Sequence, residues 1–144
     1  MKALEAMNAW KLVPLPEGKK PVGCRWVFKV KNKPDVTVER FKARLVAEGY
    51  SQKPGIDFSQ TFALVVRLNT LRSLLALAVK KKLIIHQMDV NTTFLNGYLE
   101  DEVYMEQPPG YVREGQEQLV CRLHRCLYGL KQAPRCWNTV FVSA

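Results

Sequence analysis

The chain has 144 residues, of which 47% are hydrophobic and 24% charged, and its formal net charge is +9. This length and balance fit one globular domain or a piece of a larger one, and they exclude a disordered or fibrous chain. No apolar run reaches the roughly 18 residues of a membrane span, and the first ten residues lack the apolar core of a signal peptide, so we expect an intracellular protein, cytoplasmic or nuclear.

The positive charge is concentrated in the first part of the chain. Residues 1–88 carry 17 Lys and Arg against 6 Asp and Glu, a net of +11, whereas residues 89–144 carry 5 against 7, a net of −2. This asymmetry favours a polyanion that lies along residues 1–88. General solubility explains a basic chain equally well, and charge alone does not decide between the two.

The first predicted elements are a short helix in residues 1–9 and, in residues 11–23, a short strand followed by a loop that is rich in proline and glycine. Residues 24–31 alternate between two sets. One set is Cys24, Trp26, Phe28 and Val30, and the other is Arg25, Val27, Lys29 and Lys31. After turn residues at 32–37, residues 38–50 form a second strand. The two strands, 24–31 and 38–50, are therefore predicted to pair as an antiparallel hairpin with one basic face.

Residues 69–82 predict a helix with an apolar face that packs on a core, capped at its start by Asn69. The three lysines at its end suit the negative end of the helix dipole, so no ligand is needed to explain them. Residues 83–88 predict a short, mostly buried strand that runs into Asp89. Further elements are expected at residues 103–105 and 119–123 (strands), 128–134 (a loop) and from residue 135 (a helix). This order indicates an α+β fold with a mixed or antiparallel sheet.

Two groups of residues suggest metal chemistry. A carboxylate at a strand end, as at Asp89, can point a metal ligand into a cleft, although such residues are more often helix caps or turn residues. Zinc is an alternative at Cys121, His124, Cys126 and Cys136, but the spacing of two, one and nine intervening residues departs from the usual paired ligands. With no regular framework, the four cysteines are predicted to be reduced thiols.

Several blocks in the same order resemble copia-type retrotransposon reverse transcriptases. Residues 86–111 (HQMDVNTTFLNGYLEDEVYMEQPPGY) resemble the first catalytic motif and the stretch that follows it. The other matching blocks are WVFK at 26–29 with FKARLV at 41–46, GID at 55–57 with TFA at 61–63, and LYGLKQAPRCW at 127–137. The resemblance spans about residues 10–138.

The resemblance implies the fingers and part of the palm of a right-hand polymerase. Residues 1–88 would form the fingers and first palm helix, and residues 89–144 a partial palm that ends before the family's Tyr-x-Asp-Asp motif. The implied reaction adds a dNTP to a primer 3′-hydroxyl on an RNA or DNA template, using Mg²⁺. Asp89 matches the first metal-binding, catalytic aspartate. Because Mg²⁺ needs more than one carboxylate, we expect weak binding and no primer extension by this chain alone.

The same resemblance implies nucleotide-binding residues. Phe94 matches a gate that excludes a ribose 2′-hydroxyl, with core packing as the alternative, and the backbone N–H of Val90 is placed to hold triphosphate oxygens. Lys42 and Arg44 match basic residues that grip the triphosphate, and a solvated strand face is the alternative for both. The template-handling loop contributes Gly129, Lys131 and Gln132.

The chain departs from the family pattern at several points. Thr93 and Leu64 replace an expected Ala and Pro, and Asp35-Val36 replaces an expected Asp-Gly turn. The final residues, 141–144, are expected to break the last helix. The acidic run 100–102 is explained by a solvated turn and does not replace the missing carboxylates. Two further hypotheses therefore stay open: a non-catalytic nucleic-acid-binding module, and a non-functional remnant with an exposed sheet edge and apolar face, unless the rest of a Pol polyprotein completes it.

Overall fold

The computed structural model describes residues 1–63 and 66–143. Its elements in chain order are α1 (Lys2–Ala6), β1 (Trp10–Val13), β2 (Cys24–Asn32), β3 (Val38–Ala47), the 3-10 turn η1 (Gly49–Ser51), α2 (Leu68–Lys80), the 3-10 turn η2 (Thr93–Asn96), β4 (Tyr104–Met105), β5 (Val120–Leu123) and α3 (Ala133–Val142). The predicted α+β class is confirmed, and both sheets are antiparallel. Leu64 lies outside the described residues.

The central sheet joins segments that are far apart in the sequence. Its strand order is β1-β5-β4, with Trp10 opposite Leu123 and Tyr104 opposite Arg122. The core lies against this sheet and includes Leu4 near the N-terminus as well as Met105 and Leu127. Residues on both sides of position 88 thus share one core, and the assignment of the two ranges to fingers and palm stays a prediction.

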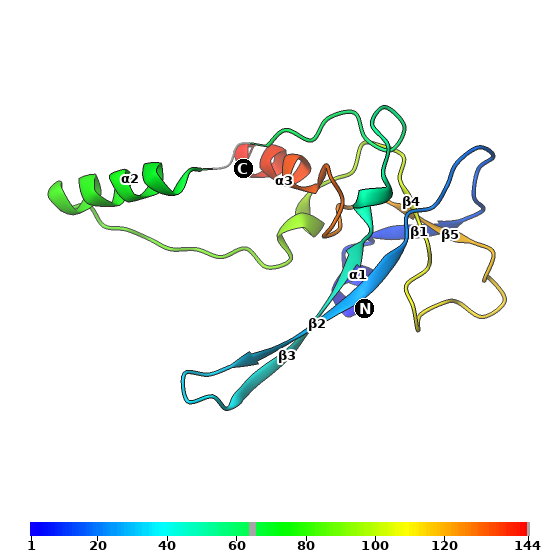
Figure 1. Ribbon diagram of the computed structural model, residues 1–144, viewed down its shortest axis with the longest axis horizontal. Helices are drawn as coiled ribbons and strands as arrows, with labels where there is room; N and C mark the ends of the chain where they lie inside the picture. The colour runs from blue at the N-terminus through cyan, green and yellow to red at the C-terminus, as the bar shows by residue number, and fades with distance from the viewer. Residues whose placement is uncertain (64–65, 144) are drawn as a thin grey trace.

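Strands β2 and β3 form a separate two-stranded hairpin that projects from the core (Figure 1). The hairpin is attached at its base, where Val22 pairs with Met105 and the Trp26 indole N–H donates to the Pro109 carbonyl at 3.0 Å. Toward the tip its apolar side chains are exposed, and Phe41 is 81% exposed. The predicted hairpin is confirmed, although β3 ends at Ala47, before η1.

Helix α2 has the predicted position but not the predicted packing. No residue of α2 is buried, and the helix stands apart from the strands (Figure 1). Its N-cap is Arg67, without a side-chain cap, so the predicted cap at Asn69 is wrong. The helix still forms because leucine and alanine have high intrinsic helix propensity. Its apolar face is unburied because no other described element covers it.

Residues 83–88 do not form the predicted buried strand. They have no regular structure and are all exposed, and Met88 is 89% exposed. A strand is stabilised by hydrogen bonds to a neighbouring strand, and no described segment pairs with these residues. The prediction is therefore wrong in its burial as well as in its strand pairing, within the described residues.

The last helix does not break at residue 141 as predicted but ends at Val142, and Ala144 lies outside the described residues. Helix α3 runs from Ala133 to Val142 and therefore includes Phe141. Pro134 in its first turn fits the N-terminal preference of proline. In the part of the chain that the structure describes, no helix has both the length and the apolar character to cross a membrane.

Candidate nucleic-acid interface

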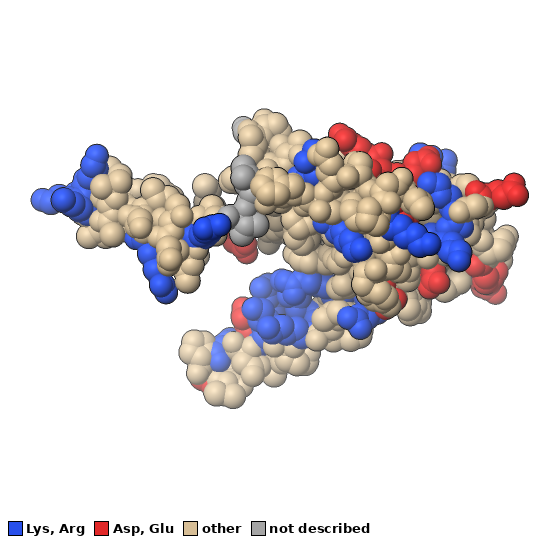
Figure 2. Space-filling model, turned by 45° about the horizontal axis from the view of Figure 1, so that its top comes forward, with Lys and Arg blue, Asp and Glu red and all other residues tan. Residues whose placement is uncertain are grey.

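One face of the β2–β3 hairpin is lined with cations. Side chains alternate along a strand, so residues two apart share a face. In the observed register Lys29 lies opposite Lys42, and Lys31 lies opposite Arg40. We call the six cations of this side the basic face: Arg25, Lys29, Lys31, Arg40, Lys42 and Arg44. They form the dense blue cluster on the hairpin in Figure 2.

No salt bridge within the described residues neutralises the basic face. Within residues 1–63 and 66–143, the one salt bridge joins Arg122 to Glu102 at 3.0 Å, away from this face. The pKa of Lys42 is lowered chiefly by the nearby Arg44, with desolvation and further cations adding to the effect. Like charges opposite one another destabilise a hairpin. Such a surface gains stability when a polyanion binds to it.

Tyr128 sits where the basic face meets the core. Its ring lies 5.2 Å below the Arg44 guanidinium carbon, and the Phe94 ring packs against it edge-on at 4.7 Å between centroids. The backbone is fixed as well, because the Ala47 N–H donates to the Tyr128 carbonyl at 2.7 Å. A cavity of about 170 Å³ beside Tyr128 is lined in part by Lys42, Arg44 and Thr92.

Gly129 is required by the close approach of its loop to β3. Its φ is +93°, and a Cβ placed on it would lie 2.0 Å from the Ala47 carbonyl oxygen. A side chain at this position would displace the strand, so only glycine fits. The loop that carries Tyr128 can therefore run directly against the end of the hairpin.

Lys131 and Gln132 belong to a different network. Gln52 accepts the Lys131 backbone N–H at 2.9 Å, and its amide donates to Gln132 Oε1 at 3.1 Å. Gln132 donates in turn to the Asp57 carbonyl at 3.0 Å, and the Lys131 ammonium donates to the Gln52 carbonyl at 2.9 Å. Gln132 is buried. Both residues thus tie the loop 127–132 to residues 52–57.

Asp89 and Val90 lie on the exposed, irregular segment after α2. Asp89 is near enough to Lys42 to raise the pKa of that lysine, against the larger lowering by the cations. The Val90 carbonyl accepts the Thr93 hydroxyl at 2.9 Å. Asp89 therefore lies within electrostatic range of Lys42, whereas Lys131 and Gln132 bond to Gln52.

The described residues hold no cluster of three or more His, Cys, Asp or Glu side chains placed to bind a metal. This contradicts the zinc alternative, since Cys121 is buried and His124 exposed. Mg²⁺ requires several oxygen ligands, and Asp89 alone does not supply them. The described residues therefore do not fit a magnesium ion by themselves.

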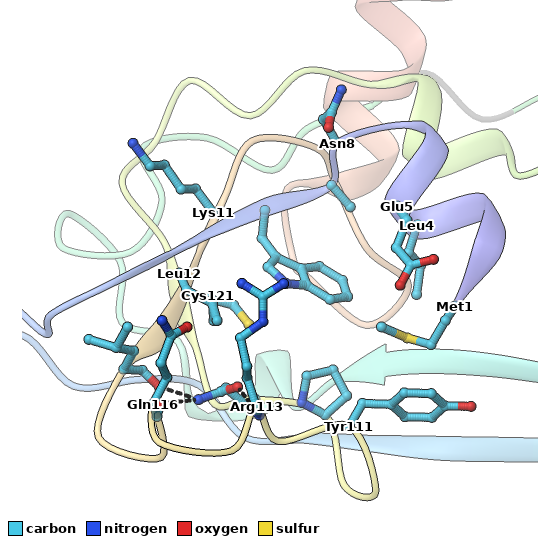
Figure 3. Close-up of a pocket in the computed structure, with 15 residues that line it drawn as sticks. Met1, Leu4, Glu5, Asn8, Lys11, Leu12, Tyr111, Arg113, Gln116 and Cys121 are labelled. Carbon is cyan, nitrogen blue, oxygen red and sulfur yellow. Dashed lines mark hydrogen bonds between the residues drawn. The ribbon is translucent and has the colours of Figure 1, made fainter.

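A second cavity is lined by none of the six cations of the basic face (Figure 3). It measures about 580 Å³ and is separated from the smaller one by Met1 and Leu4, which line both. Gln107 beside it is fully engaged: its amide donates to the Gln116 and Leu119 carbonyls, and its oxygen accepts the Arg113 N–H. Both amide hydrogens of Gln107 are therefore used within the protein, and none is free to donate to a ligand.

Sequence reasoning missed three residues of this region. Arg40 extends the period-two pattern of Lys42 and Arg44, so the same alternation could have identified it. Tyr128 and Gln52 gave no local signal, because the contacts of Tyr128 with Arg44 and of Gln52 with Lys131 and Gln132 join residues about 80 apart in the sequence.

Comparison with known families identifies the class of protein. Residues 7–144 match the family described as reverse transcriptase (RNA-dependent DNA polymerase). The match covers nearly all of the chain, which therefore belongs to the reverse transcriptase family.

The relatives are transposon Pol polyproteins. The chain is 49% identical over 143 residues to the retrovirus-related Pol polyprotein from transposon TNT 1-94 of Nicotiana tabacum, covering 99% of this chain and 11% of the relative. Over 131 residues it is 50% identical to the polyprotein from transposon RE2 and 48% to that from RE1, both of Arabidopsis thaliana, covering 90% of this chain and 9% of each relative. No solved structure matches. The resemblance to copia-type reverse transcriptases is confirmed, and the chain spans about a tenth of these relatives.

Proposed function

We propose that the chain forms the part of an RNA-directed DNA polymerase that contacts the template-primer and the incoming dNTP, inside the cell. The observation that carries the proposal is the basic face, whose six cations have no salt-bridge partner among the described residues. Phosphate contacts supply most of the sequence-independent affinity of a protein for nucleic acid. A polymerase needs such affinity because it must move along every sequence.

The two ends of the basic face take different roles. Lys42 and Arg44, which line a cavity with Tyr128, bind the triphosphate, and the planar guanidinium of Arg44 suits bidentate phosphate contact. Lys31 and Arg40 lie farther toward the hairpin tip, and together with Lys29 they contact the phosphates of the template. Phe94, which packs on Tyr128, would act as the gate against a ribose 2′-hydroxyl.

The loop 127–132 positions this site. Gly129 lets the backbone approach β3, while Lys131 and Gln132 are engaged by Gln52 and support the loop. Direct nucleotide contact by Lys131, Gln132 or the Val90 N–H stays a prediction. Asp89 would supply one ligand to a magnesium ion whose other carboxylates come from outside the described residues, such as the rest of a longer Pol polyprotein. We therefore expect no primer extension by this chain alone.

The test is binding of a labelled primer-template by the purified chain, followed by fluorescence anisotropy across a salt series. Affinity should fall steeply with salt, because each neutralised phosphate releases counterions. The double variant Lys42→Ala/Arg44→Ala should reduce the slope of log affinity against log salt concentration by the equivalent of about two phosphate contacts. Its matched control is Lys80→Ala/Lys81→Ala, which removes the same charge from the end of α2 and should change the slope little. A flat salt response of the unaltered chain, or equal effects of the two variants, would refute the interface.

A non-catalytic nucleic-acid-binding module is the second candidate, favoured by the lack of a multi-carboxylate cluster among the described residues. Incorporation of dNTP on a primed RNA template separates it from a polymerase. Incorporation that disappears in Asp89→Asn would contradict both this candidate and our expectation for the chain alone. Incorporation that survives in Asp89→Asn would indicate a contaminating polymerase.

A further inference from the structure

The second cavity lies between α1, β1 and the loop 106–119, which joins β4 to β5 (Figure 3). Its volume of about 580 Å³ is in the range of small-molecule sites in proteins. The turn between α1 and β1 brings two parts of the wall together, because Asn8 adopts φ +47° and the Ala9 N–H donates to the Leu4 carbonyl at 3.0 Å. All three segments contribute to the apolar part of the wall, which includes Leu4, Trp10, Leu12 and Leu119.

The loop 106–119 is fixed at two points. Inside it, the Gln107 oxygen accepts the Arg113 backbone N–H at 3.0 Å, while the Gln107 amide donates to two carbonyls of the same loop. Toward the hairpin, the Trp26 indole N–H donates to the Pro109 carbonyl at 3.0 Å, and the Trp26 ring centroid lies 5.6 Å from that of Tyr111. Arg113 and Tyr111 are therefore held at the cavity before a ligand arrives, and such preorganisation lowers the entropic cost of binding.

The charged side chains of the cavity leave one positive charge without an opposing group. Two cations, Lys11 and Arg113, line it against one carboxylate, Glu5, a net of +1. Arg113 extends into the cavity from the loop, and Glu5 extends into it from α1 (Figure 3). Among the described residues, the Arg113 guanidinium has no salt bridge and no hydrogen bond, and it is exposed. A ligand with a single negative charge complements this arrangement, whereas Glu5 disfavours a dianion.

The uncharged part of the lining is rich in flat rings. Trp10 is half-buried and belongs to β1, and Tyr111 is 54% exposed and belongs to the loop. Pro108 lines the cavity as well and is buried. Aromatic walls with a few polar groups are typical of sites that bind a flat apolar body, because ring faces and edges pack against another ring.

We propose that this cavity binds a small aromatic monocarboxylate. The carboxylate pairs with the Arg113 guanidinium, whose planar fork suits bidentate contact. The ring lies against Trp10 and Tyr111, and Lys11 adds to the positive potential. The site goes beyond the proposed polymerase role and does not depend on it, because no cation of the basic face lines this cavity.

The test measures how 1-naphthoate protects arginines of the full chain, in dilute solution, from phenylglyoxal, which modifies accessible guanidinium groups. Adducts on chymotryptic peptides are quantified by mass spectrometry. Arg113 should be half-protected at a naphthoate concentration at least ~10-fold lower than Arg40 of the basic face, because a charged hydrogen bond and ring contact act together only in the cavity. In a parallel titration, dATP should protect Arg44 and leave Arg113 reactive, so the proposed function is tested separately.

Two further probes separate the contributions of charge and ring. 1-Naphthalenemethanol has the same rings without the charge, and acetate has the charge without the rings. Both should protect Arg113 only at concentrations at least ~10-fold above that of naphthoate. Equal protection by acetate and naphthoate, equal protection of Arg113 and Arg40, or an Arg113 that stays reactive at every naphthoate concentration would overturn the proposal.

A gain of affinity gives a control that loss of folding cannot imitate. Glu5→Gln removes the carboxylate that repels an anion, so it should lower the naphthoate concentration for half-protection of Arg113 by roughly 3-fold. Glu17→Gln is the matched control, because Glu17 is exposed and does not line the cavity. Equal effects of the two variants would also overturn the proposal.

Discussion

At the scale of single residues, the candidate site depends on a few close contacts around Tyr128. Arg44 above the ring and Phe94 at its edge are held because the Tyr128 backbone is bonded to β3. An aromatic ring under a guanidinium restricts the orientation of the guanidinium while leaving the guanidinium N–H groups free for phosphate. The side chains of the site are thus positioned by the backbone of one loop. A substitution that moves this loop should therefore disturb the whole site.

Gly129→Ala tests this dependence. A non-glycine residue at φ +93° is strained, and its Cβ would overlap the Ala47 carbonyl, so we expect a loss of at least about 2 kcal/mol in the free energy of unfolding. The measurement is urea unfolding followed by tryptophan fluorescence. Gly110→Ala is the matched control, because Gly110 also has positive φ (+78°) but no atom within 4 Å of its Cβ position. Equal losses in the two variants would show that the overlap with Ala47 contributes nothing.

At the scale of elements, the hairpin turn shows a local conflict between sequence and structure. Val36 adopts φ +67°, a left-handed conformation that is unfavourable for a β-branched residue, and its side chain is 77% exposed. The turn holds nevertheless, because the Asp35 carboxylate accepts the Thr37 backbone N–H at 3.0 Å and also its hydroxyl. These bonds lower the pKa of Asp35. The expected Asp-Gly pair would have avoided the strain.

Val36→Gly should therefore stabilise the hairpin. Relief of the left-handed strain contributes about 1–2 kcal/mol, and the greater freedom of glycine in the unfolded chain offsets up to about 1 kcal/mol of it. We expect a net gain of up to about 1 kcal/mol, measured by hydrogen exchange of the β2 and β3 amides. Val38→Gly is the control: it lies within β3, where glycine weakens a strand, so its amides should exchange faster. Faster exchange in Val36→Gly would contradict the argument.

The elements that could be predicted from sequence are those whose signal is local. The alternation of Arg25, Lys29 and Lys31 determines a strand face, and the basic face follows from it once the register is known. The signal for helix α2 is also local, because helix propensity depends on the residues of the helix and not on a partner segment. The strand expected before Asp89 failed because pairing is a property of two segments. The contacts of Gln52 with Gln132, and of Arg44 with Tyr128, join elements that no period in the sequence connects.

At the scale of the whole molecule, apolar surface is distributed unevenly. The core around the β1-β5-β4 sheet is well packed, and among the described residues no buried side-chain polar atom lacks a hydrogen-bond partner. In contrast, α2 and residues 83–88 present leucine, isoleucine and methionine to solvent: Leu71 is 46% exposed and Ile84 85%. Contiguous apolar surface of this kind is characteristic of a surface that is covered in a larger assembly, or else of an aggregation-prone one. The chain spans about a tenth of its relatives.

We therefore expect the isolated chain to aggregate, and the apolar face of α2 to contribute to it. Leu71→Gln/Leu75→Gln removes two leucines from that face without changing the charge, and glutamine keeps the helix propensity high. Each leucine contributes about 1 kcal/mol to association when it is covered, so the double variant should raise the concentration at which aggregates appear by roughly 30-fold. Static light scattering over a dilution series measures this. Leu77→Gln is the control, because Leu77 lies on the opposite side of α2 and should shift the threshold less. A monomeric unaltered chain with cooperative thermal unfolding would show that the exposed face does not drive association.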